Sequence, residues 1–329
     1  MSDYANNHVA SACYLRPWAG EDGNLRRVLT GQLKSEPKRP AKAGFRRRLF
    51  GNAAVSKAAE RRMTIYESEG IDALRRIDAD WPLDLPTKAK IGALVAVHMV
   101  RNPAVLEITS QLLSKQIIEK LPQYEREFSP DKVSELVRSL TSNEFRVSHM
   151  LETIPKTASL VASMHWTLLD FEGPLLATGD QPVTAVPLLG DDGRAEVVPM
   201  PSTGYVATTE LRLALGPSRA LLLTWMNDED TERPLPCDDA IAVELNRAVV
   251  AQADREWFHH PDRRPARITA NDFDLESCRA ISHDLIPGYS VEAAAVSPRR
   301  DHTRELLEGM IEDNVLNAYH IGGVRREQS

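Results

Sequence analysis

The hydrophobic period of this chain changes twice along the sequence, and this change limits its fold more than any other feature. Between residues 52 and 160 apolar side chains recur every three or four positions, which is typical of amphipathic helices. Between residues 164 and 228 short apolar runs alternate with turn residues, which is typical of strands. The helical period returns between residues 238 and 320. Because helices and strands occupy separate blocks, the sequence predicts an α+β fold and not alternating βα units.

Prolines and one glycine set the expected limits of the helices. Gly70 could divide the first helix, and Pro103 is expected to break the chain after the second, because proline disfavours helical backbone at the preceding residue. A third helix is expected to end at Leu121–Pro122, and Ser129–Pro130 is a good start for a fourth. That helix is expected to continue towards residue 154 or to restart beyond Pro155.

The strand block predicts an antiparallel meander with flanking helices, because turn signals are closely spaced and no helical segment intervenes. Glu172–Pro174 is one turn signal, and Gly190–Gly193 is typical of a hairpin. The expected strands are residues 25–30 near the start, then 166–169, 175–178, 183–188, 195–198, 205–209, 211–215 and 220–225. Further helices are expected from residue 238 to about 258 and from residue 302 to about 319.

Length and composition exclude several classes of protein. The 329 residues suffice for one large domain, and we expect a single α+β domain over residues 1–329. No stretch approaches the roughly 18 apolar residues of a membrane span, and the polar start lacks a secretory signal. Cys13, Cys237 and Cys278 lie far apart, which argues against a disulfide framework or structural zinc site and predicts a cytoplasmic location. No phosphate-binding loop or dinucleotide motif is present, so the sequence names no cofactor.

The formal net charge of −7 is unevenly distributed along the chain. Residues 24–62 contain twelve Lys and Arg residues and two acidic residues, so this segment carries +10 and the remainder −17. Dense positive charge attracts nucleic acid and other phosphate-rich ligands. The segment lacks the aromatic residues that stack on bases, which favours a solvated segment facing the acidic remainder. Residues 34–42 are rich in proline and predict an exposed loop.

Several short motifs, taken in order, resemble one family. The motifs are Asn7-His8-Val9, Cys13 to Ala19, Ala58-Ala59-Glu60, Val97 to Pro103, Leu176 to Val183, Leu213 to Ser218, and Leu245-Asn246 with Arg255. Their order over residues 7–258 resembles the family called domain of unknown function 4238. Its members typically open with His-Tyr-Val-Pro-Gln-x-Tyr-Leu-Arg-x-Phe and carry a Thr-Ser-Asp-x-Pro-Val turn. The chain departs at Val9-Ala10-Ser11, at Trp18 in place of Phe and at Gly179 in place of Ser, and the resemblance implies no known activity.

Four polar residues fall on these motifs in four separate segments: His8, Arg101, Asp180 and Asn246. Asp180 follows an expected apolar strand and precedes Pro182, so its carboxylate lies at a turn where it could pair with Arg101 or orient His8. An Asp–His pair could act as a general base, because the carboxylate sets the imidazole tautomer and its pKa. Arg101 could hold an anionic substrate through two hydrogen bonds. These four are therefore the candidate catalytic residues.

The same four residues also have a structural interpretation. An aspartate before X-Pro often caps a turn, an arginine at a helix end often pairs with such a carboxylate, and Asn246 could bridge backbone groups of the sheet. A metal site is a weaker hypothesis. Glu256 and His259 would share one face of the expected helix, but a di-metal helical site needs a second copy of that spacing. His98 is expected to be a core residue.

Two hypotheses of function follow, from different classes. The first is an enzyme of hydrolase or nuclease type, in which His8 and Asp180 move protons and Arg101 stabilises negative charge on a carboxylate- or phosphate-bearing substrate. The second is a non-catalytic binding or regulatory protein, in which these residues are structural and residues 24–62 contact a nucleic acid or an acidic partner. The sequence leaves open the choice, the substrate, any metal requirement and the oligomeric state.

Overall fold

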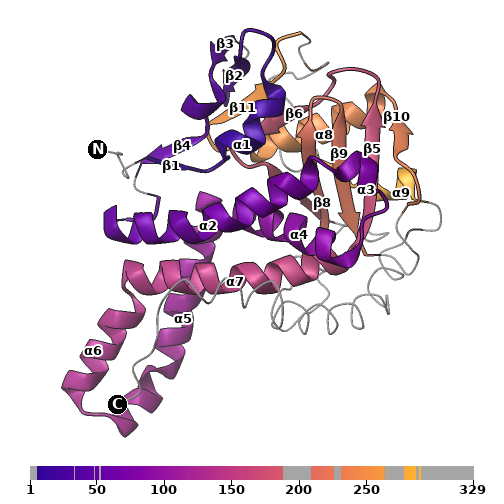
Figure 1. Cartoon of the computed structure of the whole chain (residues 1–329). Helices are drawn as coiled ribbons and strands as arrows, with labels where there is room; N and C mark the ends of the chain where they lie inside the picture. Colours follow the sequence, from indigo (N-terminus) through magenta and orange to yellow (C-terminus); the bar gives the residue numbers. More distant parts are fainter. Residues whose placement is uncertain are drawn as a thin grey trace.

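The structure is a computed structural model, and it describes most of the chain up to residue 262 with a few residues beyond it. The described residues are 6–32, 34–47, 49–51, 53–187, 209–225, 231–262, 265, 278–286 and 289. Figure 1 shows sheets and a layer of long helices packed together, in agreement with the predicted α+β class. The expectation of one domain over residues 1–329 stays a prediction.

The amino-terminal part is richer in strands than expected. It contains β1 (Asn6–His8), α1 (Ala12–Leu15), η1 (Arg16–Trp18), β2 (Leu25–Leu29), β3 (Ser35–Lys38), η2 (Pro40–Lys42) and β4 (Phe45–Arg47). The prediction of a loop over residues 34–42 is wrong, because β3 pairs with β2 in antiparallel fashion. Pro37 fits there because β3 is an edge strand, where a missing backbone donor is tolerated.

The helical block contains α2 (Ala53–Leu74), α3 (Ile77–Asp80), α4 (Leu85–Val100), α5 (Pro103–Glu127), α6 (Pro130–Leu140) and α7 (Asn143–Ser163). The predicted break before Pro103 is confirmed, but Gly70 does not divide α2. A Cβ atom at Gly70 would lie 2.5 Å from the Cβ of Leu94 on α4. The glycine therefore permits close packing of α2 against α4, and it does not end the helix.

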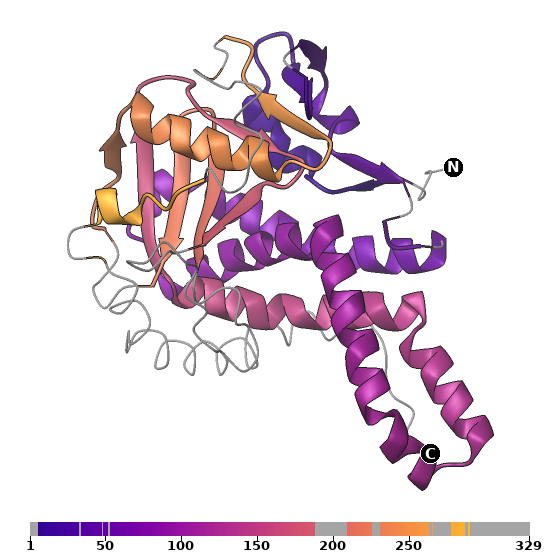
Figure 2. The ribbon, with the colours of Figure 1, turned by 180° about the vertical axis from the view of Figure 1, so that it is seen from behind.

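Two prolines that were expected to end helices lie inside them. Pro122 lies within α5 and Pro155 within α7. The chain breaks instead at residues 141–142, where the Ser142 side chain accepts a hydrogen bond from the backbone N–H of Phe145 and caps α7. Both views show α5 and α6 projecting away from the rest of the molecule (Figures 1 and 2).

The strands after α7 divide between two sheets. One has the order β10-β5-β9-β8-β7 and the other β3-β2-β11-β6. Their later members are β5 (His165–Phe171), β6 (Ala177–Gly179), β7 (Val183–Pro187), β8 (Thr209–Gly216), β9 (Arg219–Thr224), β10 (Leu235–Cys237) and β11 (Glu256–His259).

The predicted meander is therefore only partly correct. β7, β8, β9 and β5 pair as antiparallel neighbours, but β6 joins the other sheet although it follows β5 in sequence. β10 also runs parallel to β5, so the larger sheet is mixed. The expected turn at residues 190–193 and the strand at 195–198 lie outside the described residues, as does the expected helix at 302–319.

The late helix is shorter than predicted. α8 (Asp239–Gln252) ends six residues before the expected limit, and residues 256–259 form strand β11. α8 crosses the face of the larger sheet that is nearer the viewer in Figure 2. α9 (Ser282–Leu285) is the last described element.

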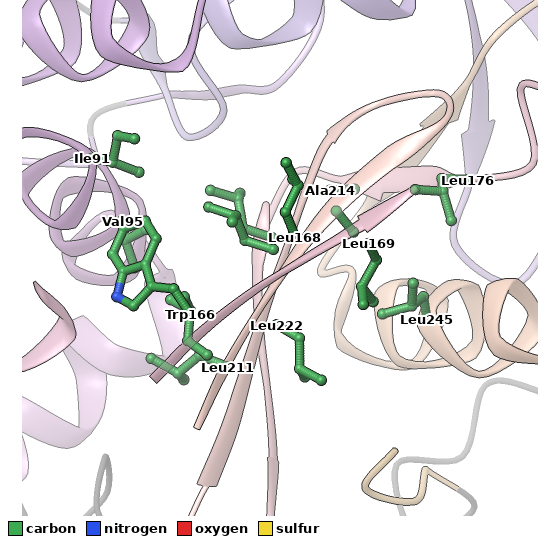
Figure 3. Packing of buried hydrophobic residues seen from close by; sticks show 14 of the residues in the cluster. Ile91, Val95, Trp166, Leu168, Leu169, Leu176, Leu211, Ala214, Leu222 and Leu245 are labelled. Atoms are coloured by element: carbon green, nitrogen blue, oxygen red, sulfur yellow. The ribbon is translucent and has the colours of Figure 1, made fainter. Parts of the chain in front are cut away.

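The main core lies on both faces of the larger sheet. Ile91 and Val95 of α4 pack near Trp166 of β5, while Leu245 of α8 packs on the side of Leu222 (Figure 3). This core joins the middle of α4 to the segment that leads into β6. None of the helices that the structure describes has the length and hydropathy that a membrane crossing requires.

Candidate functional site

Polar residues gather around the small two-stranded sheet formed by β1 and β4. In this sheet Asn7 pairs with Arg46 and His8 with Phe45. Figure 1 shows the two strands above α2. The other residues of the site come from α2, from the end of α4 and from the turn after β6. Their contacts form two groups, one around Arg101 and one around Asp180.

Arg101 is the centre of the first group. It caps the carboxyl end of α4, and its side chain is only 1% exposed. Its Nη1 donates to Glu67 Oε1 at 2.6 Å, and its Nη2 donates to Glu60 Oε2 at 2.8 Å and to Glu67 Oε2 at 3.2 Å. Glu60 and Glu67 are seven residues apart and so lie on one face of α2. The Nε of Arg101 is buried and has no hydrogen-bond partner among the described residues.

Asn7 joins β1 to this group. Its Nδ2 donates to Glu60 Oε1 at 3.2 Å and to Ser56 Oγ at 3.1 Å, and its Oδ1 accepts from the backbone N–H of Leu49 at 3.0 Å. Burial raises the pKa of Glu60, while Arg101 and Asn7 act in the opposite direction. Asn7 and Glu60 therefore fix the position of the strand that carries His8.

His8 lies beside the Arg101 group but does not bond to it. Its ring packs on Phe45, with the ring centroids 4.0 Å apart. Burial, and then the charge of Arg101, lower the pKa of His8 to about 4, so the imidazole is neutral at pH 7. Its Nε2 is buried and has no hydrogen-bond partner within the described part of the chain. Within that part no hydrogen bond or ion pair joins His8 to Arg101 or to Asp180.

Asp180 is the centre of the second group and is 2% exposed. Its Oδ1 accepts from the backbone N–H of Asp254 and its Oδ2 from that of Arg255, both at 2.9 Å. Arg46 donates to Oδ2 at 3.4 Å and also pairs with the Asp254 carboxylate. Burial raises the pKa of Asp180 to about 6, against the backbone hydrogen bond from Arg255 and the charge of Arg46. The carboxylate thus ties the end of β6 to the segment before β11.

Asn246 lies apart from both groups. Its Oδ1 accepts from the backbone N–H of Ala177 at 2.7 Å, and its Nδ2 donates to the backbone carbonyl of Leu175 at 2.9 Å. The side chain therefore bridges α8 to the backbone at the start of β6. This is the arrangement that the structural interpretation of Asn246 anticipated.

The four candidate residues do not form one directly bonded cluster. The two groups are joined through the β1–β4 strand pair, because Asn7 and Arg46 are neighbours across these strands. They are also joined by Asn102, whose Nδ2 donates to Gln181 Oε1 at 2.6 Å. Arg46 and Glu67 were missed as site residues. The available signal was the seven-residue spacing of Glu60 and Glu67 on a helix that precedes a buried arginine.

The proposed metal ligands do not share a helical face. Glu256 and His259 lie on strand β11, where residues three apart point to opposite faces. Glu256 Oε1 accepts from the backbone N–H of Gly44 at 2.7 Å, and its Oε2 accepts from Arg27 at 3.3 Å. A search of the described residues finds no group of His, Cys, Asp and Glu side chains that could hold a metal ion.

The basic segment 24–62 divides into paired and exposed cations. Arg27 pairs with Glu36 and Glu256, and Arg46 pairs with Asp180 and Asp254. Some of its charge is therefore balanced within the chain. Other cations of the segment are exposed on the surface: Lys34, Arg39, Lys42, Arg47, Arg61 and Arg62.

Comparison with known proteins gives a family but no activity. The family model described as "Protein of unknown function (DUF4238)" matches residues 6–263, which include all four candidate residues. No curated protein and no solved structure matches the chain. Because the matched segment is more than half of the sequence, the chain belongs to the DUF4238 family.

Proposed function

We propose that this protein is an enzyme of hydrolase type in which His8 accepts a proton and Arg101 contacts the substrate. The observation that carries the proposal is that Nε2 of His8 and Nε of Arg101 both lack a hydrogen-bond partner among the described residues. Buried polar atoms usually have partners, so an unpaired atom on a titratable side chain calls for an explanation, and a role in catalysis is one. The charge of Arg101 lowers the pKa of His8, so the two side chains influence each other.

The neutral imidazole supports a role in proton transfer. With a pKa of about 4, His8 is neutral at pH 7 and keeps a lone pair on one ring nitrogen, although it is a weaker base than an ordinary histidine. Glu60 has a raised pKa and binds the same arginine, so it is the second candidate for holding a proton. We propose that His8 acts as the base and Glu60 as the acid.

The charges around Arg101 restrict the charge of a substrate that could bind there. Glu60 and Glu67 together outweigh the single charge of Arg101, which disfavours a polyanion at this point. The Nε–H of Arg101 remains able to donate one hydrogen bond to an acceptor. We therefore propose a small substrate that offers a single carboxylate or phosphate-ester oxygen there, with the cytoplasm as the location and nuclease activity as a weaker variant.

Asp180 and Asn246 receive positioning roles in this proposal. Both place their polar atoms against backbone groups of the chain and are almost fully buried, which commits them to the fold. Asp180 also holds Arg46 and, through Arg46, the β1–β4 strand pair that carries His8.

The test is turnover by the wild-type protein and by His8→Gln on the same panel of chromogenic carboxylate esters and phosphate esters. We expect turnover of at least one ester by the wild type and a loss of roughly a hundredfold or more in His8→Gln. Lys42→Gln, an exposed change on the neighbouring surface, is the matched control and should keep full turnover. No turnover on the panel, or equal turnover by His8→Gln, would contradict the proposal.

The alternative is a non-catalytic protein that binds an acidic partner through the exposed part of segment 24–62. The observation that favours it is the group of exposed cations around η2 and β4, among them Lys42 and Arg47. Its test is the affinity for single-stranded and double-stranded DNA and RNA as a function of salt. The alternative predicts binding that weakens steeply with salt, whereas no binding at low salt removes nucleic acid as the partner.

A further inference from the structure

A cavity lies away from the Arg101 group. Its volume is about 340 Å³, which is within the range of small-molecule sites. It lies between η1 and the carboxyl end of α2, and Leu215 at the end of β8 also lines it. The apolar part of its lining comes from Ile71, Leu74 and Leu215. These side chains would bury the hydrocarbon part of a ligand.

Two guanidinium groups also line this cavity. The guanidinium of Arg16 is exposed and makes no ion pair or hydrogen bond with any residue that the structure describes. Arg75 Nη1 lies 2.7 Å from Asp72 Oδ1, with the two side chains 62% and 68% exposed. An exposed pair of this kind stabilises a protein by at most about 1 kcal/mol, so Arg75 can also contact a ligand. Two cations and one nearby acid leave the rim with a net positive charge.

Tyr14 separates the cavity from the Arg101 group. Its hydroxyl donates to the backbone carbonyl of Ala214 at 2.5 Å and lies 2.8 Å from Thr178 Oγ1. Its ring lies 5.1 Å from that of His98, which is buried one turn before Arg101 on α4. Because both bonds hold Tyr14 in place, the cavity has a fixed wall on this side. A ligand there does not depend on the proposed reaction at His8.

We propose that this cavity binds a small organic anion with an apolar body, of the class of medium-chain carboxylates. The hydrocarbon part lies against Ile71, Leu74 and Leu215, and the carboxylate lies at the rim near Arg16 and Arg75. Charge complementarity selects the anion, because an uncharged molecule of the same shape leaves both guanidinium groups without a new partner. The apolar lining disfavours small anions such as acetate or inorganic phosphate.

Cys13 provides a direct readout of occupancy. It is exposed and lines the same cavity, whereas Cys237 is half-buried in strand β10. We expect octanoate to slow the alkylation of Cys13 by iodoacetamide several-fold, as measured by mass spectrometry, while 1-octanol and acetate at equal concentration have little effect. The rate at Cys237 should not change. Equal protection by octanoate and 1-octanol, or no protection by octanoate, would overturn the proposal.

Calorimetric titration with octanoate tests the residues of the cavity. Arg16→Gln combined with Arg75→Gln should weaken binding by about threefold to tenfold, because two contacts to a charged group are lost. Leu74→Trp, which fills the cavity, should abolish binding. Arg39→Gln, which changes an exposed arginine elsewhere, should bind like the wild type. Wild-type affinity for octanoate in the arginine variant, or any octanoate binding in Leu74→Trp, would contradict the proposal, and melting curves show whether each variant is folded.

Octanoate binding to the cavity does not depend on the proposed enzyme activity. His8→Gln should bind octanoate with wild-type affinity, because His8 does not line the cavity. Loss of octanoate binding in His8→Gln would show that cavity and candidate site are one site, which contradicts a separate one. Conversely, octanoate binding by a protein that turns over no ester would support the cavity proposal and would contradict only the proposed function.

Discussion

Two arginines of this protein are almost fully buried next to glutamates, but their surroundings differ. Arg101 lies at the end of α4, bonded to Glu60 and Glu67 of α2. Arg212 lies on β8, bonded to Glu210 of the same strand. The first group is next to the β1–β4 strand pair, and the second is bonded to the start of α9, the last described helix. They allow a comparison of two buried ion-pair groups within one chain.

Every charged group around Arg212 has a partner. Its Nη1 donates to the backbone carbonyl of Glu244 at 3.0 Å and its Nη2 to that of Arg279 at 2.5 Å. Glu210, which is 0% exposed, accepts from the backbone N–H groups of Ile281 and Ser282 and thereby caps α9. This group fastens residues 279–286 to the larger sheet. Its arrangement is that of a structural connection.

The Arg101 group differs, because not every titratable side chain in it has all of its polar atoms paired. Arg101 Nε and His8 Nε2 have no partners among the described residues. The comparison teaches that burial and charge alone do not distinguish a structural group from a functional one. Among the described residues, the atoms left unpaired near Arg212 are the hydroxyls of Ser282 and Tyr289, whereas those near Arg101 belong to the arginine itself and to a histidine. The distinguishing feature is therefore whether the arginine at the centre of the group keeps an unpaired atom. The predictions below test this distinction.

The largest loss of stability is expected at the Arg212 group, in which every charged side chain has its partners. Glu210→Gln removes the carboxylate that balances Arg212 and leaves a buried charge without compensation. Loss of one partner of such a pair costs about 3 to 5 kcal/mol of unfolding free energy. Urea unfolding measures this, with Glu36→Gln as the control because Glu36 is half exposed in its pair with Arg27. A cost below that of the control would mean that the Arg212 group is not a structural connection.

A smaller effect, with a defined pH dependence, is expected for Asp180. Its folded pKa of about 6 lies above the unfolded value near 3.8, so the folded state binds a proton more tightly. The contribution of Asp180 to stability is therefore fully present below about pH 4 and is lost as the pH rises through about 6. Asp180→Asn should remove this change, which amounts to about 2 to 3 kcal/mol.

Unfolding free energies of wild type and Asp180→Asn at several pH values between 4 and 7 provide the measurement. The difference between the two proteins should change steadily over this range, and the wild type should lose relative stability as the pH rises. A difference that is constant with pH, or a change of the opposite sign, would show that burial does not dominate at Asp180.

The sequence-based predictions agree best with the structure where one residue type determines the local backbone by itself. The start of α6 at Ser129–Pro130 and the break before Pro103 were predicted because proline fixes the local backbone. The same reasoning failed at Pro122 and Pro155, where the helices continue. β11 was also missed, because a short apolar run fits helix and strand equally well and its partners β2 and β6 are distant in sequence.

The site was predictable only in part, for a similar reason. His8, Arg101, Asp180 and Asn246 all proved to be half-buried or buried polar residues with defined neighbours. Their partners could not be predicted, because Glu67 and Arg46 come from elements whose packing is set by the whole fold. Asn246 illustrates the limit most clearly, since its two bonds are to backbone groups, which carry no signal in the sequence.

Loss of the His8 side chain beside the Arg101 group should change the stability of the protein only a little. His8→Gln removes a side chain whose Nε2 makes no hydrogen bond to any residue in the described part of the chain, so the unfolding free energy of the variant at pH 7 should fall by no more than about 1 kcal/mol. The lowered folded pKa of His8 contributes stability that is present above about pH 6.5 and is lost as the pH falls towards 4. His8→Gln should therefore be less sensitive to acid than the wild type. A cost as large as that of Glu210→Gln would mean that both groups are structural.

The smallest expected effect is a shift in the titration of His8. Glu60→Gln removes one of the two negative charges that offset Arg101, so the field of Arg101 at His8 becomes more positive. The pKa of His8 should then fall further. Arg101 keeps its two bonds to Glu67, so the fold should be preserved. A rise in the pKa of His8 would show that Glu60 does not belong to the same electrostatic group.

The most direct test of the difference between the two groups is the NMR titration of the His8 imidazole in the wild-type protein. The pKa should be about 4, and the nitrogen shifts at pH 7 should be those of a neutral ring whose Nε2 bonds to no protein group. A pKa near the ordinary value of 6.5, or an Nε2 that bonds within the folded chain at neutral pH, would contradict the assignment of His8 as a free proton acceptor beside Arg101.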